Sequence, residues 1–154
     1  MFKEFNLENL ENSKELLENI LDENRKKIAD LLEIENKTYK NFVLPFQEIG
    51  ESINDFLTPI FHIDSVKNSE ITTKVYEECI PVISKYETEI SQNESIYTAF
   101  KDIQSKEKST LNNIQNKVLE NEIRDFKLSG CHLEIDKKKR LEEISLRLSE
   151  LSHK

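Results

Sequence analysis

The chain has 154 residues, a net charge of -8, and only 2 glycines and 3 prolines, where average usage would give roughly ten and eight. Glycine-rich phosphate loops, dinucleotide-binding turns and β-hairpin networks need glycine at positive φ, so this composition argues against them. The acidic surface repels nucleic-acid phosphates and anionic lipid, and a charged fraction of 34% beside an apolar fraction of 36% suits long helices with one buried stripe.

The first predicted helix begins at Asn12–Ser13, with Asn12 as the N-cap and Glu15 at the reciprocal position of a capping box. We expect it to end at Asn36–Lys37. Apolar residues recur along it at steps of three and four, which indicates one buried face. These residues are Leu16, Leu17, Ile20, Leu21, Ile28, Leu31 and Leu32.

A second helix is predicted from Asn41 to Leu57, with Pro45 in its first turn, where a missing N–H costs little. We expect residues 59–68 to form a connection to the next helix. The residues predicted to face inward are Phe42, Phe46, Ile49, Ile53, Phe56 and Leu57.

A third helix is expected to follow the N-cap Ser69 and to reach Ile90, and Pro81 in its middle predicts a kink rather than a break. Its inward residues are Val75, Cys79, Val82, Ile83, Tyr86 and Ile90. Asn93 is the expected N-cap of a short fourth helix. That helix carries Ile96, Tyr97, Phe100 and Ile103.

Two more helices complete the predicted fold. The fifth runs from Thr110 to Ser129 and is closed by Gly130 in a left-handed conformation. The sixth starts at Asp136 and reaches the end of the chain without a closing residue, so we expect the protein to continue beyond Lys154. The apolar stripes are Leu111, Ile114, Val118, Leu119, Ile123 and Phe126 in the fifth helix, and Leu141, Ile144, Leu148 and Leu151 in the sixth. The predicted fold is all-α, an antiparallel bundle of about six helices.

The cysteines and the N-terminal residues bear on the cellular compartment in which we expect the protein. Cys79 and Cys131 are too few for a disulfide framework and lack CxxC spacing, and Cys79 lies on an apolar stripe as a small buried side chain. The first residues lack the apolar region of a signal peptide, and no apolar run approaches the roughly 18 residues that span a bilayer. We expect a soluble, cytoplasmic protein.

The histidines do not have the spacing of a zinc peptidase helix. His62, His132 and His153 are scattered, whereas His-Glu-x-x-His places two imidazoles on one helical face. His62 with Asp64 is a candidate metal or acid/base pair, but a loop histidine that bonds the backbone is the favoured interpretation.

A second short cluster, Cys131-His132 with Glu134 and Asp136, lacks the second ligand pair of a structural zinc site.

No serine lies in a G-x-S-x-G turn. The adjacent carboxylates of Glu77-Glu78 and of Glu142-Glu143 diverge around a helix, so they do not form a catalytic pair. Core packing explains Tyr86, Tyr97 and Phe100, and the basic run Lys137-Lys138-Lys139-Arg140 is interpreted as a solvated helix face.

Several longer blocks of sequence, taken in their order along the chain, indicate a protein family. They are His62-Ile63-Asp64-Ser65-Val66-Lys67-Asn68-Ser69, Tyr76-Glu77-Glu78-Cys79-Ile80-Pro81, Ser84-Lys85-Tyr86, Glu89-Ile90-Ser91-Gln92-Asn93, Tyr97, Glu120-Asn121-Glu122-Ile123-Arg124-Asp125-Phe126-Lys127-Leu128-Ser129-Gly130, and the tail from Arg140-Leu141 to Ser152. In order and spacing these blocks resemble the thimet oligopeptidase family of zinc metallopeptidases, specifically its bacterial oligopeptidase A branch. The segment from Phe5 to Tyr39 resembles the family more weakly.

The resemblance implies that residues 1–154 are the N-terminal, non-catalytic helical domain of such an enzyme, forming one wall of a deep channel that admits short, unfolded peptides. In this family the zinc motif lies downstream, in a C-terminal catalytic domain. Zinc, that domain and short peptide substrates are therefore implied for the full-length parent enzyme. No position here matches a catalytic or zinc-binding residue of the family, so no catalytic, cofactor-binding or metal residue is assigned to this chain. Arg124 and Asp125 are candidates for pairing with neighbouring helices.

Two other functions compete with the peptidase-domain hypothesis. One is a free-standing helical interaction module that binds a partner helix. The other is a small metal enzyme or sensor that uses His62, Cys131 and His132. Under the favoured hypothesis the 154-residue chain does not cleave peptides, even with added zinc, and binds neither nucleic acid nor membrane. The apolar stripe of the sixth helix also predicts self-association.

Overall fold

The computed structural model describes residues 10–152, apart from the side chains of residues 149, 150 and 152. Within this part every regular element is helical, which confirms the all-α prediction. The α-helices are α1 (Ser13–Leu32), α2 (Leu44–Val66), α3 (Glu70–Ser91), α4 (Glu94–Glu107), α5 (Asn113–Leu128) and α6 (Ile135–Ser152). A 3-10 turn, Leu10–Asn12, precedes α1, and a π-helical turn, Tyr39–Val43, leads into α2.

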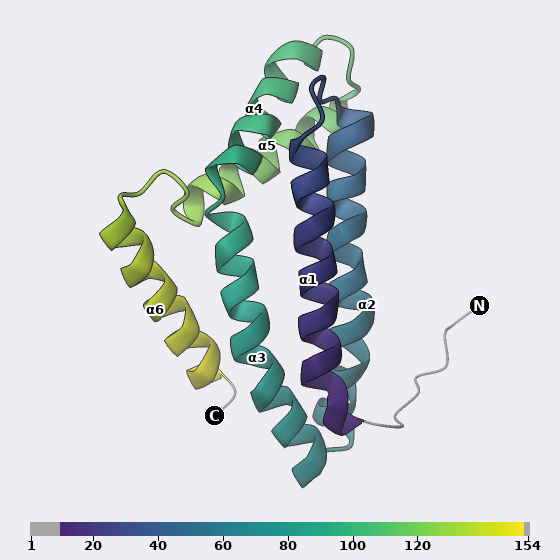
Figure 1. Cartoon of the computed structure of the whole chain (residues 1–154), viewed down its shortest axis with the longest axis vertical. Coiled ribbons are helices and arrows are strands. Elements are labelled where there is room, and N and C mark those ends of the chain that lie inside the picture. Colours follow the sequence, from purple (N-terminus) through teal and green to yellow (C-terminus); the bar gives the residue numbers. More distant parts are fainter. Residues whose placement is uncertain (1–9, 153–154) are drawn as a thin grey trace, which may run out of the picture.

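Three long helices form the body of the molecule. α1, α2 and α3 lie side by side, and successive helices run in opposite directions (Figure 1). α4 and α5 contact each other across one end of this layer, and α6 lies along the outer side of α3 (Figure 1). The arrangement is therefore a mainly antiparallel helical bundle, as the sequence predicted.

The core consists of two apolar clusters. One lies where α4 and α5 meet the end of α1 and the start of α2, and the buried rings of Phe42 and Phe100 meet there edge to face with centroids 5.7 Å apart. The other lies between α1, α2 and α3, where Leu17 is 0% and Leu21 is 1% exposed. Burying one such side chain contributes roughly 1.5–3 kcal/mol, so the two clusters account for much of the favourable free energy of folding.

Side-chain caps fix several helix boundaries where the sequence predicted them. The Ser69 hydroxyl accepts from the Thr72 N–H (3.2 Å), and the Asn93 side chain accepts from the N–H groups of Ser95 and Ile96. Both caps satisfy backbone donors that the first helical turn leaves without a carbonyl partner. The predicted starts of the third and fourth helices are therefore confirmed.

Gly130 closes α5 as predicted. Its φ is +78°, the left-handed region that glycine adopts without strain. The Cys131 N–H donates to the Phe126 carbonyl (3.2 Å), and the Gly130 N–H donates to the Lys127 carbonyl (3.1 Å). These two bonds form the Schellman motif of a helix C-terminus.

The predicted start of the first helix at Asn12–Ser13 is confirmed, but its predicted cap and its predicted end were wrong. Asn12 precedes α1, but its side chain makes no capping hydrogen bond, because the 3-10 turn gives it φ -92° and ψ 4° instead of the extended conformation that a capping side chain needs. The capping box with Glu15 is therefore not formed. At the other end, α1 stops at Leu32, before Asn36–Lys37.

The predicted connection at residues 59–68 was wrong, because α2 continues through Pro59 to Val66. Pro59 donates no N–H to the preceding turn, but Leu57 and Ile60 on either side of it are each only 6% exposed. Burial of these neighbours in the core offsets the missing hydrogen bond. α3 likewise continues through Pro81, whose expected kink stays a prediction, and Pro45 lies in the first turn of α2 as predicted.

The fifth helix begins three residues later than predicted. Thr110 donates its hydroxyl to the Glu107 carbonyl and lies in the turn that follows α4, while Asn112 and Gln115 form the capping box of α5. Some residues predicted to face inward are exposed instead, because no described helix packs over that part of their stripe. They are Leu16 (47%), Ile114 (76%), Ile144 (42%), Leu148 (60%) and Leu151 (47%).

Candidate functional site

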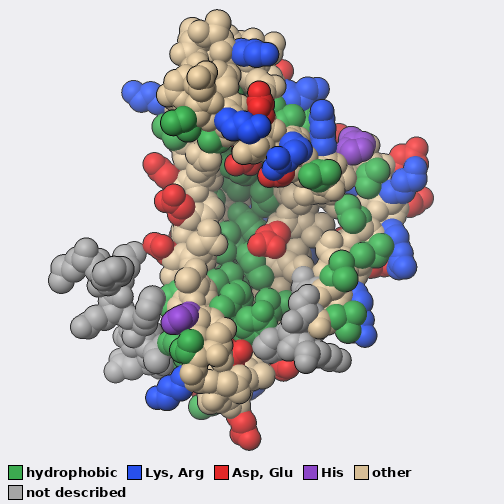
Figure 2. Space-filling view, turned by 180° about the vertical axis from the view of Figure 1, so that it is seen from behind, with side chains coloured by type: hydrophobic (Ala, Val, Ile, Leu, Met, Phe, Trp, Pro, Cys, Tyr) green, Lys and Arg blue, Asp and Glu red, His purple; other side chains and the backbone are tan. Residues whose placement is uncertain are grey.

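A groove of about 550 Å³ lies between α2, α3 and α5, and we call it the α2–α3–α5 groove. Figure 2 shows it as a furrow along the molecule with hydrophobic side chains on its floor and an acidic side chain within it. The floor is formed by Ile28, Phe46, Ile49, Ile53, Ile83 and Phe126. Most of these residues also belong to the core, so a rigid surface supports the groove.

The groove extends along α2 in two smaller cavities. One, of about 410 Å³, lies toward Gln47 and Glu51, and the other, of about 230 Å³, lies toward Thr58 and Phe61. Asn54 lines all three cavities. Its amide is both a hydrogen-bond donor and an acceptor, so it is suited to bind a peptide group.

The wall of the groove on α2 is low at Gly50. A Cβ built at this position would meet nothing within 4 Å, so the absence of a side chain leaves open space rather than allowing a close contact. One of the only 2 glycines in the chain thus lies within a helix that borders the groove and leaves room there.

Two glutamates give the groove its electrostatic character. Glu87 of α3 is accessible from the groove, yet the protein around it displaces enough water to raise the pKa of its carboxyl. Burial also raises the pKa of Glu122 on α5, with a further contribution from the negative charge of Asp125, while a hydrogen bond with Gln47 opposes the shift. Both shifts have the direction expected when a carboxylate loses hydration.

Positive charge beside the groove comes from Arg124, which pairs with Asp125 at the groove's edge in the described part of the chain. Among the residues described as lining the three cavities there is no lysine, arginine or histidine. Within the described part of the chain, moreover, the Glu87 carboxylate has neither a hydrogen bond nor an ion pair. A carboxylate in such a place is stabilised by any cation that enters, because the cation replaces lost water with a direct charge interaction.

Sequence reasoning missed Glu87 and Glu122, although a signal was present. Glu87 lies four residues after Ile83 and three before Ile90, and Glu122 lies four residues before Phe126. A carboxylate at these spacings shares the face of its apolar neighbours. A charged residue among the apolar residues of a helical stripe is thus the sequence pattern that could have identified the groove glutamates.

The structure separates the members of the predicted His62–Asp64 pair. His62 is exposed and lies within α2 rather than in a loop, whereas Asp64 is buried with 6% exposure. One Asp64 oxygen accepts from the Asn68 amide (2.9 Å) and from the Thr73 hydroxyl (3.2 Å). Asp64 therefore links the end of α2 to the start of α3.

The second candidate cluster is also divided between the interior and the surface. Cys131 is 0% exposed, while His132, Glu134 and Asp136 are exposed. His153 lies outside the described residues. Over residues 10–152, no group of three or more His, Cys, Asp and Glu side chains is arranged to hold a metal ion. The chain's described residues thus do not fit a zinc centre.

The remaining predicted residues have structural places. Cys79 is fully buried, as expected, and burial raises the pKa of its thiol to about 11. Tyr86 and Phe100 are buried in the core and Tyr97 packs against it, which confirms their predicted role. Arg124 pairs with its sequence neighbour Asp125, so the expected pairing with other helices was wrong.

The basic run on α6 forms two ion pairs with residues close in sequence and one ion pair with α4. Lys137 pairs with Glu134, Arg140 with Glu143, and Lys138 reaches Glu94 of α4 with Nζ and Oε1 2.6 Å apart. In the described part of the chain no helix is long and apolar enough to cross a membrane.

The fold and the groove define a class: an all-α helical domain with an acidic groove whose floor is apolar. Residues 17–138 match the family described as Neurolysin/Thimet oligopeptidase, N-terminal domain. The chain belongs to this family, and the family predicted from the sequence blocks is confirmed.

Curated relatives agree with this assignment. The chain is 36% identical over 137 residues to Oligopeptidase A of Haemophilus influenzae, which covers 88% of this chain and 20% of the relative. It is 38% identical over 117 residues to Oligopeptidase A of Escherichia coli, covering 75% and 17%. A Probable cytosolic oligopeptidase A of Arabidopsis thaliana is 30% identical over 118 residues, covering 76% and 17%. The chain thus spans a fifth or less of the length of these relatives.

Proposed function

We propose that this chain is the N-terminal, non-catalytic wall domain of an oligopeptidase A-like zinc metallopeptidase that hydrolyses short peptides in the cytoplasm. The observation that carries the proposal is the match of residues 17–138 to the N-terminal domain of the family. The share of the relatives that the chain covers, 17–20%, supports a separate catalytic domain elsewhere in the same polypeptide.

Zinc belongs to the parent enzyme in this proposal and not to these residues. When bound in the catalytic domain, zinc would polarise the scissile carbonyl and activate water. The wall domain does no chemistry of this kind. Its rigid helices limit the width of the channel, and its acidic surface draws cationic peptides toward it.

The test compares the 154-residue chain with the product of the full reading frame. We expect the frame to continue beyond Lys154 into a His-Glu-x-x-His helix, and the full-length enzyme to cleave short quenched-fluorescence peptides with zinc. The 154-residue chain should leave the same peptides intact with and without zinc. Zinc-dependent cleavage by the short chain that is lost in His62→Ala or His132→Ala would overturn the proposal.

The exposed apolar stripe of α6 gives the proposed function a second test, because under this proposal the rest of the polypeptide covers the stripe. The stripe on α6 that includes Ile144, Leu148 and Leu151 is largely exposed, and hydrophobic side chains on this face lie beside the groove (Figure 2). Exposed apolar surface of this kind marks an interface. Sedimentation of the 154-residue chain tests it: self-association is expected, and a strict monomer without dye-binding apolar surface would count against it.

A further inference from the structure

We propose that the α2–α3–α5 groove is a peptide-binding subsite selective for a positive charge: it takes a lysine or arginine side chain, or a free α-ammonium group, flanked by bulky apolar side chains. The inference rests on the proposed function and adds to it a place on the wall domain and a chemical class of peptide.

The size and floor of the groove fit short peptide segments. Its volume of about 550 Å³ lies within the range of roughly 300–1,000 Å³ that is usual for small-ligand sites. Ile53 and Ile83 form part of a floor on which apolar side chains would lose water-exposed area without displacing protein. Such burial gives affinity with little dependence on the order of the apolar residues.

The charge selectivity follows from the two glutamates. Glu87 faces the groove with no partner among the described residues, and Glu122 shares its wall with Asp125, whose own charge is paired with Arg124. Their carboxylates are partly desolvated, so an ammonium or guanidinium group that enters the groove gains a charge-assisted hydrogen bond. An anionic peptide would instead bring a like charge beside these two carboxylates.

The peptide backbone has a polar partner at the centre of the groove. Asn54 lies where the groove meets both smaller cavities, and its amide can donate to a carbonyl and accept from an N–H of an extended peptide. The two glutamates thus select a peptide that carries a positive charge, the apolar floor contributes affinity, and Asn54 orients the peptide backbone.

The first experiment measures fluorescence anisotropy of labelled peptides on the 154-residue chain. The probes are acetyl-Leu-Lys-Phe-Leu-amide and its versions with glutamine or glutamate in place of lysine. We expect the lysine peptide to bind about tenfold or more tightly than the glutamine peptide, the change typical of a charge-assisted hydrogen bond. The glutamate peptide should bind most weakly.

Variants then locate the site. Glu87→Gln and Glu122→Gln should each remove most of the preference for lysine, whereas Glu23→Gln, an exposed glutamate on α1 away from the groove, should leave it unchanged. Gly50→Leu supplies a test that does not depend on charge, because its side chain would occupy free space in the groove and weaken binding of all three peptides. Thermal unfolding confirms that each variant is folded.

Equal affinity for the lysine and glutamine peptides, or an unchanged preference in both groove variants, would overturn the inference. So would a full-length enzyme in which the double variant Glu87→Gln/Glu122→Gln has the wild-type KM for cationic peptides, as when another segment of the polypeptide covers the groove. That enzyme would still cleave peptides, so the inference would fail while the proposed function held. Conversely, lysine-selective binding by a chain whose reading frame encodes no catalytic domain would retain the subsite and refute the proposed function.

Discussion

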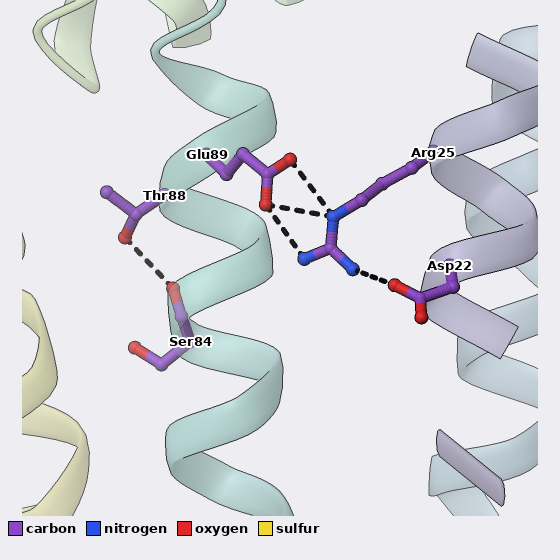
Figure 3. A network of polar contacts seen from close by, with 5 residues as sticks. All are labelled: Asp22, Arg25, Ser84, Thr88 and Glu89. Carbon is purple, nitrogen blue, oxygen red and sulfur yellow. Dashed lines mark hydrogen bonds and ion pairs between the residues drawn. The ribbon is translucent and has the colours of Figure 1, made fainter. Parts of the chain in front are cut away.

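Arg25 of α1 and Glu89 of α3 form a bidentate ion pair between two neighbouring helices (Figure 3). Arg25 Nη2 lies 2.8 Å from Glu89 Oε2, and Arg25 Nε lies 3.0 and 3.1 Å from the two carboxylate oxygens. The same guanidinium contacts Asp22 (2.8 Å) and stacks 5.1 Å from the centroid of the Tyr86 ring. The hydrogen bond to Glu89 is the largest cause that raises the pKa of Arg25. One side chain therefore links α1 to α3 and contributes to their alignment.

A double-mutant cycle with Arg25→Met and Glu89→Gln should give a coupling energy of about 0.5–1 kcal/mol in urea unfolding. The value is modest because both side chains are partly exposed, at 36% and 46%, and water screens their charges. It should fall when salt is added. Arg25→Met alone should cost more than the coupling, because it also removes the contact with Tyr86.

The Arg124–Asp125 pair is the matched control, since its members are sequence neighbours on one helix. Arg124→Met should change the free energy of unfolding by less than about 0.5 kcal/mol. A coupling energy of zero between Arg25 and Glu89, or an effect of equal size at Arg124, would contradict a role in aligning the helices.

Replacing each of the two glycines by alanine should have opposite effects on the stability of the chain. Gly130→Ala should destabilise the chain by roughly 1–3 kcal/mol, because the left-handed conformation strains a residue with a Cβ. That Cβ would also lie 2.6 Å from Leu133 Cδ1 and 2.8 Å from Leu141 Cδ2. Gly50→Ala should stabilise the chain by up to about 1 kcal/mol, since Gly50 lies within α2 and an added Cβ would meet nothing within 4 Å.

Chemical denaturation of the two variants measures both effects with one protocol. A loss of stability in Gly50→Ala would mean that the groove wall is more crowded than it is in the structure. An unchanged Gly130→Ala would mean that the Schellman turn can be replaced by another closure of α5.

Buried Asn24 makes a polar contact between α1 and α2 inside the core. Its amide donates to the Ile49 carbonyl (3.2 Å) and to the Ser52 hydroxyl (3.1 Å). Asn24→Ala should cost about 1–3 kcal/mol, because it removes these bonds and leaves space at a residue with 1% exposure. Exposed Asn19 on the same helix is the control, and Asn19→Ala should have little effect on the unfolding midpoint. Equal midpoints for the two variants would refute a structural role for the Asn24 contacts.

The sequence predicted helices well where spacing and local hydrogen bonds determine them. The Ser69 and Asn93 caps and the Gly130 turn each depend on residues within a few positions of one another, so the pattern was sufficient. Pro59 shows the limit of such reasoning. Its local preference is to break a helix, but the burial of Leu57 and Ile60 against distant residues decides the outcome.

The groove was harder to predict for the same reason. Glu87 and Glu122 lie on different helices, and only the packing of α3 and α5 beside α2 brings them to one concave surface. The His62–Asp64 pair shows the reverse case: these two residues are close in sequence, but they point to different sides of one helix and do not form a site. Sequence proximity is thus a poor guide to a site in an all-helical chain.

The dependence of stability on pH should reveal the environment of the groove glutamates. In the folded state the pKa of Glu87 and of Glu122 is raised above the ordinary value of 4.5, so the folded chain holds these protons more tightly than the unfolded chain does. Their ionised forms therefore destabilise the fold at neutral pH, and this cost disappears as the pH falls through the raised pKa toward 4.5. Glu87→Gln and Glu122→Gln should each raise the free energy of unfolding at pH 7, with a gain that vanishes below about pH 4.

Glu94 supplies a control of opposite sign. The hydrogen bond from Lys138 lowers the pKa of its carboxyl, so its contribution stabilises the fold above pH 4.5 and is lost as the pH falls through the lowered folded-state pKa. Glu94→Gln should therefore weaken the fold at pH 7, where the two groove variants strengthen it. Urea unfolding of the three variants between pH 7 and pH 3 provides the comparison. If Glu87→Gln leaves stability at pH 7 unchanged or lowers it, the groove does not desolvate Glu87, because a well-hydrated carboxylate would gain nothing from neutralisation.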